Sequence, residues 1–123
     1  MFNLLGNNYE IKDEKLLDSV TAISGSGPAY FFLFIHVFET IANDFGFSKK
    51  YSRNLVFDTI EGAFALAKKE KNIRKLINSV SSKKGTTEAA LKILEKKNKG
   101  LYELMKNAIY AAKKRANILS KVK

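Results

Sequence analysis

The stretch PAYFFLFIHVFETIANDF, residues 28–45, decides the fold of this chain. Its apolar side chains surround a helix on every side over the first two turns, and they are Tyr30, Phe31, Phe32, Leu33, Phe34, Ile35, Val37 and Phe38. A helix that is apolar all round must be covered all round, and a chain of 123 residues has few elements to cover it. We therefore expect a second subunit to cover part of this helix, as in interlocked helical dimers. The alternative is the central helix of a monomeric bundle.

Apolar side chains at three- and four-residue steps predict further helices. Residues 101–119 form the clearest amphipathic helix, and residues 50–69 carry a second apolar stripe. Shorter helices are predicted at Asp13–Ile23, Ile73–Val80 and Thr87–Lys97. The predicted fold class is all-α, with long core helices in an interlocked homodimer. Residues 1–123 are expected to form a single domain, in which residues 1–12 are a linker or a residual strand at Phe2–Leu5.

The composition excludes several kinds of chemistry. The chain has no cysteine, which excludes disulfides, thiolate zinc sites and a cysteine nucleophile. Its single histidine, His36, leaves room for a Ser/His pair only around that residue. A lone histidine on an apolar face is more often packed or interfacial than catalytic. No metal site is expected in this chain.

The net charge of +10 is concentrated in the C-terminal half, where residues 68–123 carry 17 bases and 4 acids. Such an asymmetry is typical of proteins that bind nucleic acid or another anion. Lysines at polar helix positions also give an ordinary solvated surface, and we favour that interpretation. The first 14 residues lack a basic segment followed by an apolar one, and the run Pro28–Phe38 is too short to span a membrane. We therefore expect a cytoplasmic protein without a membrane partner.

A first motif, TAISGSGPAY, occupies residues 21–30. Its two glycines do not form a dinucleotide fingerprint, because the third glycine of G-x-G-x-x-G would fall at Tyr30 and no strand precedes the motif. The serines can cap a helix, the glycines permit a positive φ or tight packing, and Pro28 suits a first helical turn. The motif therefore predicts a helix–loop–helix joint.

A second motif, SVSSKKGTTEAA, occupies residues 79–90. Hydroxyl side chains surround Gly85 and lead into a helix whose first backbone N–H groups lack partners within the helix. Such an N-terminus binds anions, and Lys83 and Lys84 would add to the attraction. A small carboxylate or phosphate would fit there. The alternative is ordinary N-capping by Thr86 or Thr87.

Together the two motifs resemble the C-terminal half of pyrroline-5-carboxylate reductase. That family shows D-x-V-T-A-L-S-G-S-G-P-A-Y, matched here from Asp18 to Tyr30, and then V-T-S-P-G-G-T-T, matched from Val80 to Thr87. The resemblance implies an interwoven all-α dimer beside a Rossmann domain that binds NADPH or NADH. It also implies reduction of 1-pyrroline-5-carboxylate to L-proline. By this resemblance the chain begins where the Rossmann domain would have ended, so it would hold no cofactor and would be inactive alone.

The resemblance also assigns roles to residues of both motifs. It places the substrate carboxylate at Ser82, Gly85, Thr86 and Thr87, with the Thr87 hydroxyl near the ring nitrogen as the catalytic candidate. The residues that would line the pocket or seat the dimer helices are Thr21, Ser24, Gly25, Ser26, Gly27 and Pro28. Lys83 and Lys84 depart from the family's Pro-Gly, which adds two cations to the loop.

The sequence leaves two other functions open. The runner-up is a basic all-α module that binds nucleic acid through its C-terminal half. Arginine is scarce and no interleaving of exposed aromatics is evident, so we do not expect nucleic acid as a partner. The other alternative is a purely structural helical dimer without a site for a small anion.

Overall fold

The structure is a computed structural model that describes residues 2–4, 7–9, 13, 16–81 and 85–121. The chain divides into two compact units, and each is described here by itself. One unit comprises Met1–Phe31 and Lys97–Lys123, and the other comprises Phe32–Lys96. Helices account for most of the described residues, so the all-α prediction is confirmed. The assignment of residues 1–123 to a single domain stays a prediction.

The first unit begins with a short hairpin. Strand β1 (Phe2–Leu4) pairs antiparallel with β2 (Asn7–Tyr9), with Phe2 opposite Tyr9. The strand predicted at Phe2–Leu5 is therefore present as β1. The sequence gives no comparable signal for β2, because its two asparagines are depleted in strands and do not alternate with apolar residues.

The helices of the first unit are α1 (Leu17–Val20), the π-helix η2 (Thr21–Gly25), the start of α2 (Gly27–Asp44) and α6 (Leu101–Lys121). Helix α6 packs against η2 and α1. The amide of Asn117 on α6 donates a hydrogen bond of 2.9 Å to the carboxylate of Asp18 on α1. The half-buried apolar residues of α6 recur at helical spacing, and they are Met105, Ile109, Ala112 and Ala116. This confirms the helix predicted over 101–119.

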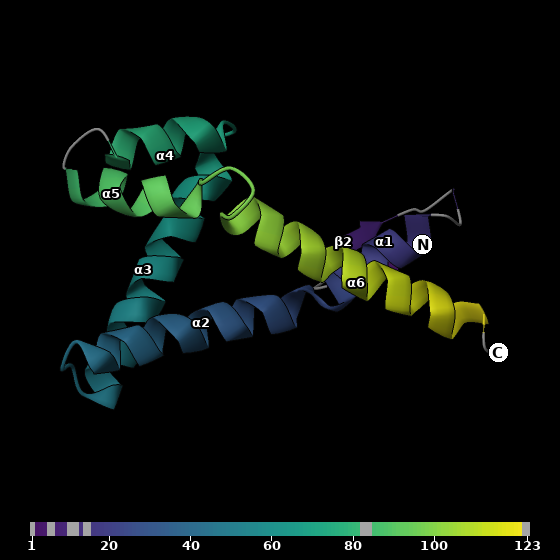
Figure 1. The fold of residues 1–123 in the computed structure, drawn as a ribbon, viewed down its shortest axis with the longest axis horizontal. Helices are drawn as coiled ribbons and strands as arrows, with labels where there is room; N and C mark the ends of the chain where they lie inside the picture. The colour runs from purple at the N-terminus through teal and green to yellow at the C-terminus, as the bar shows by residue number, and fades with distance from the viewer. Residues whose placement is uncertain (1, 5–6, 10–12, 14–15, 82–84, 122–123) are drawn as a thin grey trace. The chain divides into compact units, whose positions relative to one another are not determined.

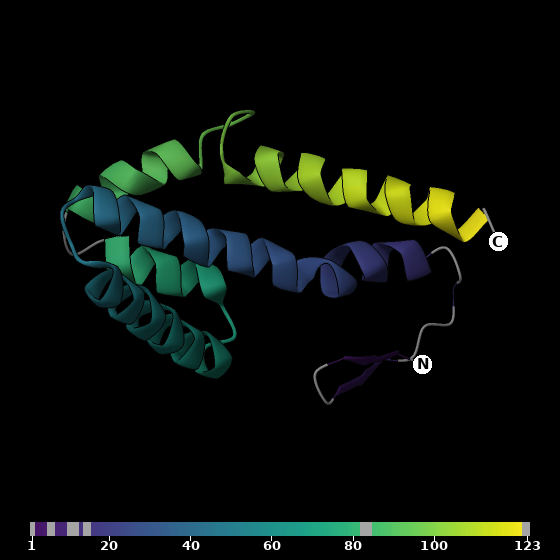
Figure 2. The same cartoon turned by 90° about the horizontal axis from the view of Figure 1, so that it is seen from below.

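The described residues of the second unit form a series of helices (Figures 1 and 2). It contains the rest of α2, then α3 (Lys49–Lys69), α4 (Ile73–Ser81) and α5 (Gly85–Leu94). These bounds confirm the predicted helices to within a few residues. The predicted helix Thr87–Lys97 begins two residues earlier, at Gly85, and ends at Leu94.

Turn and cap residues set the ends of these helices. After α2, the backbone N–H of Phe47 donates to the carbonyl of Ala42 and that of Gly46 donates to Asn43, the two bonds of a Schellman motif. Gly46 has φ +106°, which a residue with a side chain rarely adopts. The hydroxyl of Ser48 then caps α3 by accepting from the N–H of Tyr51 at 3.1 Å.

Little apolar surface is buried within the described part of the chain. The only buried apolar residues there are Ala22 in the first unit and Val56 in the second. Three successive side chains of α2, which point in different directions around the helix, stay open to solvent: Phe31 is 70% exposed, Phe32 67% and Leu33 62%. The first turns of α2 are therefore apolar all round, as predicted, and described residues of its own chain leave these three positions largely uncovered.

The helical stretch around α2 is longer than its apolar run indicates. The chain stays helical from Leu17 to Asp44, and by length and composition alone this stretch could cross a membrane. The sequence-based prediction considered only the apolar run Pro28–Phe38, which His36 interrupts. It missed this length because the upstream motif was expected to form a loop.

Candidate functional site

The two sequence motifs lie in different units. Residues 21–30 belong to the first unit, whereas Gly85, Thr86 and Thr87 belong to the second. Each motif is therefore built up from its own surroundings.

The second motif forms the N-terminus of α5. This helix begins at Gly85 and carries Glu88 in its first turn, where a carboxylate interacts favourably with the helix dipole. Thr86 is exposed and Thr87 is half-buried. The first backbone N–H groups of a helix have no partners within it, so they are available to an acceptor. Ser82 and the two lysines that depart from the family pattern, Lys83 and Lys84, lie outside the described residues.

Charged side chains are already paired along α4 and α5. Arg74 lies 2.5 Å from Glu95, and Lys92 lies 3.8 Å from Glu88 one turn away on α5. A pocket of about 250 Å³ lies between the two helices, lined by these four residues together with Ile77, Asn78, Ser81 and Leu91. Because its cations already face carboxylates, this pocket offers little net attraction to an anion. Anion binding near α5 depends instead on the backbone and hydroxyls of Gly85–Thr87.

The first motif does not form the predicted loop. Thr21–Gly25 is a π-helix in which the N–H of Ser26 donates to the carbonyl of Thr21 at 2.9 Å, five residues back. In an α-helix the N–H of Ser26 would donate to the carbonyl of Ala22, four residues back. Here the hydroxyl of Tyr30 donates to that carbonyl instead, at 2.6 Å. Single π-turns of this kind are frequent at functional sites.

Neither glycine of this motif is required by close packing within the described residues, since a Cβ added at Gly27 would meet no atom within 4 Å. Gly46 is the only described glycine with a positive φ, so neither Gly25 nor Gly27 uses that freedom. Gly27 is buried, and Pro28 lies in the first turn of α2 as predicted. A Cβ added at Gly25 would meet the methyl of Thr21 at 3.7 Å, an ordinary contact. Ala22 is completely buried, and Ser24 and Ser26 are half-buried.

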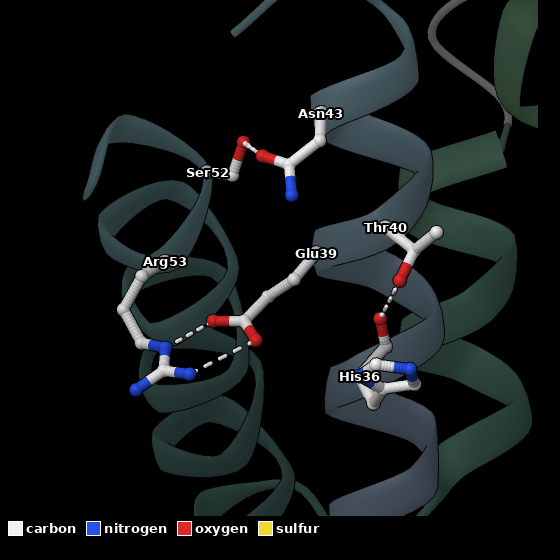
Figure 3. A network of polar contacts seen from close by, with 6 residues as sticks. All are labelled: His36, Glu39, Thr40, Asn43, Ser52 and Arg53. Carbon is white, nitrogen blue, oxygen red and sulfur yellow. Dashed lines mark hydrogen bonds and ion pairs between the residues drawn. The ribbon is translucent and has the colours of Figure 1, made fainter. Parts of the chain in front are cut away.

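A third polar cluster, which the sequence analysis did not single out, joins α2 to α3 (Figure 3). The guanidinium of Arg53 binds both carboxylate oxygens of Glu39, through Nε to Oε2 and through Nη2 to Oε1 at 3.2 Å. The hydroxyl of the fully buried Ser52 donates to the amide oxygen of Asn43 at 2.7 Å. The hydrogen bonds from Arg53 hold the pKa of the Glu39 carboxyl below its usual value. The only sequence signal was two polar residues one helical turn apart on α2 and two adjacent polar residues on α3.

The described residues do not form a site for a metal or a dinucleotide. No group of three or more potential metal ligands is found among them. A dinucleotide fingerprint needs a glycine turn between a strand and a helix. Here Gly25 and Gly27 follow the helix α1, and the two described strands belong to a short antiparallel hairpin.

Comparison with known proteins gives a consistent result. A family model described as pyrroline-5-carboxylate reductase dimerisation matches residues 14–119. A pyrroline-5-carboxylate reductase from Pseudomonas aeruginosa is 37% identical over 117 residues, which cover 94% of this chain and 42% of that protein. Pyrroline-5-carboxylate reductase 2 from Bacillus subtilis is 40% identical over 84 residues, covering 68% of this chain and 30% of the relative.

Solved structures agree with these sequence matches. The crystal structure of Plasmodium falciparum pyrroline carboxylate reductase with NADP bound has a TM-score of 0.79 and 37% identity, and the match covers 88% of this chain and 40% of that one. The structure of a pyrroline-5-carboxylate reductase from Coxiella burnetii has a TM-score of 0.79 and 36% identity, covering 89% and 40%. This chain thus spans less than half the length of each of these four proteins.

Proposed function

Because this chain belongs to the pyrroline-5-carboxylate reductase dimerisation family, we propose that it is the dimerisation and substrate-binding part of such a reductase. The observation that carries the proposal is the family match over residues 14–119. The activity we assign is reduction of 1-pyrroline-5-carboxylate to L-proline with NADPH or NADH. The nucleotide is bound outside the described residues, which do not form a dinucleotide site.

The substrate carboxylate is assigned to the start of α5. Gly85, Thr86 and Thr87 offer backbone N–H groups at a helix N-terminus, and the two threonines add hydroxyl donors. The support is twofold, because the helix start suits a carboxylate and the family resemblance points to the same residues. Ser82 belongs to this proposal but lies outside the described residues. The residues Thr21, Ser24, Gly25, Ser26, Gly27 and Pro28 are assigned to seating the dimer helices beside the pocket.

A chimeric enzyme tests the activity. The nucleotide-binding part of the Pseudomonas aeruginosa relative, joined ahead of residue 14 of this chain, should oxidise NADPH only when 1-pyrroline-5-carboxylate is present. The unfused 123-residue chain is the control, and we expect no turnover from it. A folded dimeric chimera that binds NADPH but does not turn over this substrate would contradict the proposal.

The partner that covers α2 is assigned as a second copy of the chain. The supporting observations are the exposed apolar side chains around α2 and the match to a family described by its dimerisation. A lipid bilayer is a poorer cover, because α2 carries the charged Glu39, which is ion-paired with Arg53 on α3, and charged side chains are costly within a membrane. Light scattering on the full chain should give at least a dimer mass, and a stable monomer at micromolar concentration would overturn this assignment.

A cytoplasmic location without membrane or nucleic acid as partner completes the proposal. If a second copy covers the Leu17–Asp44 stretch, the chain needs no lipid for it. Cell fractionation and flotation with phosphatidylcholine vesicles should leave the chain in the soluble fraction. Recovery with the vesicles would favour the membrane instead, and salt-sensitive binding to DNA or RNA would favour the basic nucleic-acid module.

A further inference from the structure

The corner between α2 and α3 has polar contacts on one side only. Glu39 and Asn43, one turn apart on α2, bind Arg53 and Ser52, which are adjacent on α3 (Figure 3). The side chain of Glu39 is only 14% exposed, so its carboxylate is held close against α3 while Arg53 remains 62% exposed. A bidentate pair of this kind constrains orientation as well as distance.

Apolar packing does little to fix the angle between these two helices. They diverge from the turn at residues 45–48 (Figures 1 and 2). Val56 is the only apolar residue buried in the described part of this unit, whereas Phe38 and Leu55 remain about 40% exposed. Two diverging helices share few side-chain contacts, so a small change of angle costs little packing energy. The polar contacts are therefore the main directional constraint at this corner.

The apolar side of the same corner is open. A groove of about 360 Å³ lies between the two helices, and its lining carries no charge: Phe38, Ile41, Ala42, Phe45, Leu55, Val56 and Thr59. On α2, the residues of this groove alternate at helical spacing with Glu39 and Asn43, which lie on the adjacent face. The polar side of the corner thus holds the two helices together. The opposite side exposes an apolar groove, and the shape of this groove depends on the angle between the helices.

We propose that Glu39–Arg53 and Asn43–Ser52 form a brace that sets the angle between α2 and α3 within one chain and so shapes the groove for a segment of a second copy. The occupant of the groove rests on the proposed homodimer, whereas the brace does not. A second copy fits this groove because the lining is uncharged and the same chain exposes apolar helix faces able to fill it.

A brace differs from a contact that only adds stability. Replacing a partly buried ion pair by apolar side chains of similar size is often neutral or stabilising. The variant Glu39→Met/Arg53→Met should therefore keep its helices. The angle between α2 and α3 should no longer be fixed in this variant, because methionine side chains pack without directional preference.

Spin-label distances measure this angle directly. The chain has no cysteine, so His36→Cys on α2 and Asp58→Cys on α3 provide two unique labelling positions. Both are exposed, and diluting the labelled chain with unlabelled chain restricts the signal to distances within one molecule. With the brace intact we expect one narrow distance distribution between the labels. In Glu39→Met/Arg53→Met the distribution should broaden and its maximum should shift.

Two further variants make the result decisive. Arg74→Met/Glu95→Met removes another ion pair of the same unit and should leave the distribution unchanged. The swapped pair Glu39→Arg/Arg53→Glu keeps opposite charges at the corner and should restore a narrow distance distribution. This variant tests the brace even if the methionine variant unfolds, as judged by the loss of its helical circular dichroism. An unchanged distribution in a folded methionine variant, or a broad one in the swapped variant, overturns the brace. Light scattering on the same samples tests the dimer separately, because a monomer with a narrow distribution would contradict only the proposed dimer.

Discussion

The two motifs that carry the family resemblance differ in how their polar groups are used. In residues 21–30, the Thr21 hydroxyl donates to the Leu17 carbonyl and the Tyr30 hydroxyl donates to the carbonyl that the π-helix leaves free. Around residues 85–87, the structure records no hydrogen bond from the Thr86 or Thr87 side chain to another described residue. Two hydroxyls of the first motif thus bind backbone carbonyls within the chain, whereas the hydroxyls of Thr86 and Thr87 are available to a ligand.

The burial of the two motifs differs in the same direction. Ala22 and Gly27 are buried in the first motif, and η2 packs against α6. In the second motif Gly85 and Thr86 are exposed and Thr87 is half-buried. From this contrast we expect residues 21–30 to stabilise the fold and residues 85–87 to bind the substrate. Substitutions that separate stability from turnover can break or sharpen this contrast.

The largest effect is expected for Thr87→Ala in the chimeric enzyme. If the hydroxyl binds the substrate, its loss removes a hydrogen bond to a charged group, worth about 1.5–3 kcal/mol, or roughly ten- to hundredfold in kcat/KM. The melting temperature should not change. Thr21→Ala is the matched substitution in the first motif and should reduce kcat/KM far less, because the Thr21 hydroxyl already bonds the Leu17 carbonyl. Equal losses in both variants would show that the first motif also lines the pocket.

Ala22→Leu should lower stability, in contrast to Thr87→Ala, which should lower turnover. Ala22 is completely buried where η2 packs against α6, so three added carbons overpack the site and should lower the free energy of unfolding by about 1–3 kcal/mol. Ala89→Leu makes the same change at an exposed position of α5 and should leave that free energy nearly unchanged. Denaturant unfolding at fixed protein concentration measures both. If Ala22→Leu were as well tolerated as Ala89→Leu, the first motif would not be the better packed one.

Much of the fold could be predicted because helical spacing is a local property. The apolar stripes of α3 and α6 and the all-round apolar surface of α2 are visible in the sequence, and the structure places helices there. The motif at residues 21–30 was predicted as a helix–loop–helix joint after a helix ending at Ile23, so the prediction was wrong for Ser24 and Gly25, which belong to η2. Two glycines and a proline are typical of a joint, but helix α1 continues as a π-helix, and the stabilising Tyr30–Ala22 bond spans eight residues.

The candidate site was predictable only in part. A run of hydroxyls before a helix predicts an available N-terminus, and Thr86 and Thr87 indeed lie in the first turn of α5. Their role in substrate binding stays a prediction, as do the roles of Ser82 and the residues of the first motif. The Glu39–Arg53 pair was missed because the two residues are fourteen positions apart and lie on different helices. Spacing within one helix cannot reveal a contact that depends on how two helices are placed.

Tyr30→Phe tests how much the hydrogen bond from Tyr30 to the Ala22 carbonyl stabilises the π-helix, and we expect a smaller effect than that of Ala22→Leu. The substitution removes one hydroxyl and leaves the Ala22 carbonyl without its donor, which should cost about 1 kcal/mol of the free energy of unfolding. The ring itself is retained, so packing should change little. Hydrogen exchange at Ser26, whose N–H closes the π-turn, should become faster, while exchange in α5 should not change. Faster exchange in both places would indicate a global loss of stability and not a local lock.

The smallest expected effect is a pH dependence confined to the second unit. The pKa of Glu39 is lowered in the folded chain by hydrogen bonds from Arg53, so its contribution to stability is present above the unfolded value of about 4.5 and is lost as the pH falls through the lower folded value. Glu39→Gln should therefore reduce the melting temperature slightly at pH 7, and the difference from the parent chain should shrink as the pH falls below about 4.5 and vanish below the folded pKa. Tyr30→Phe is the control from the first unit, because it removes a hydrogen bond that involves no carboxylate. A Glu39→Gln effect that is equally large at pH 3 and pH 7 would show that the carboxylate charge does not stabilise the corner between α2 and α3.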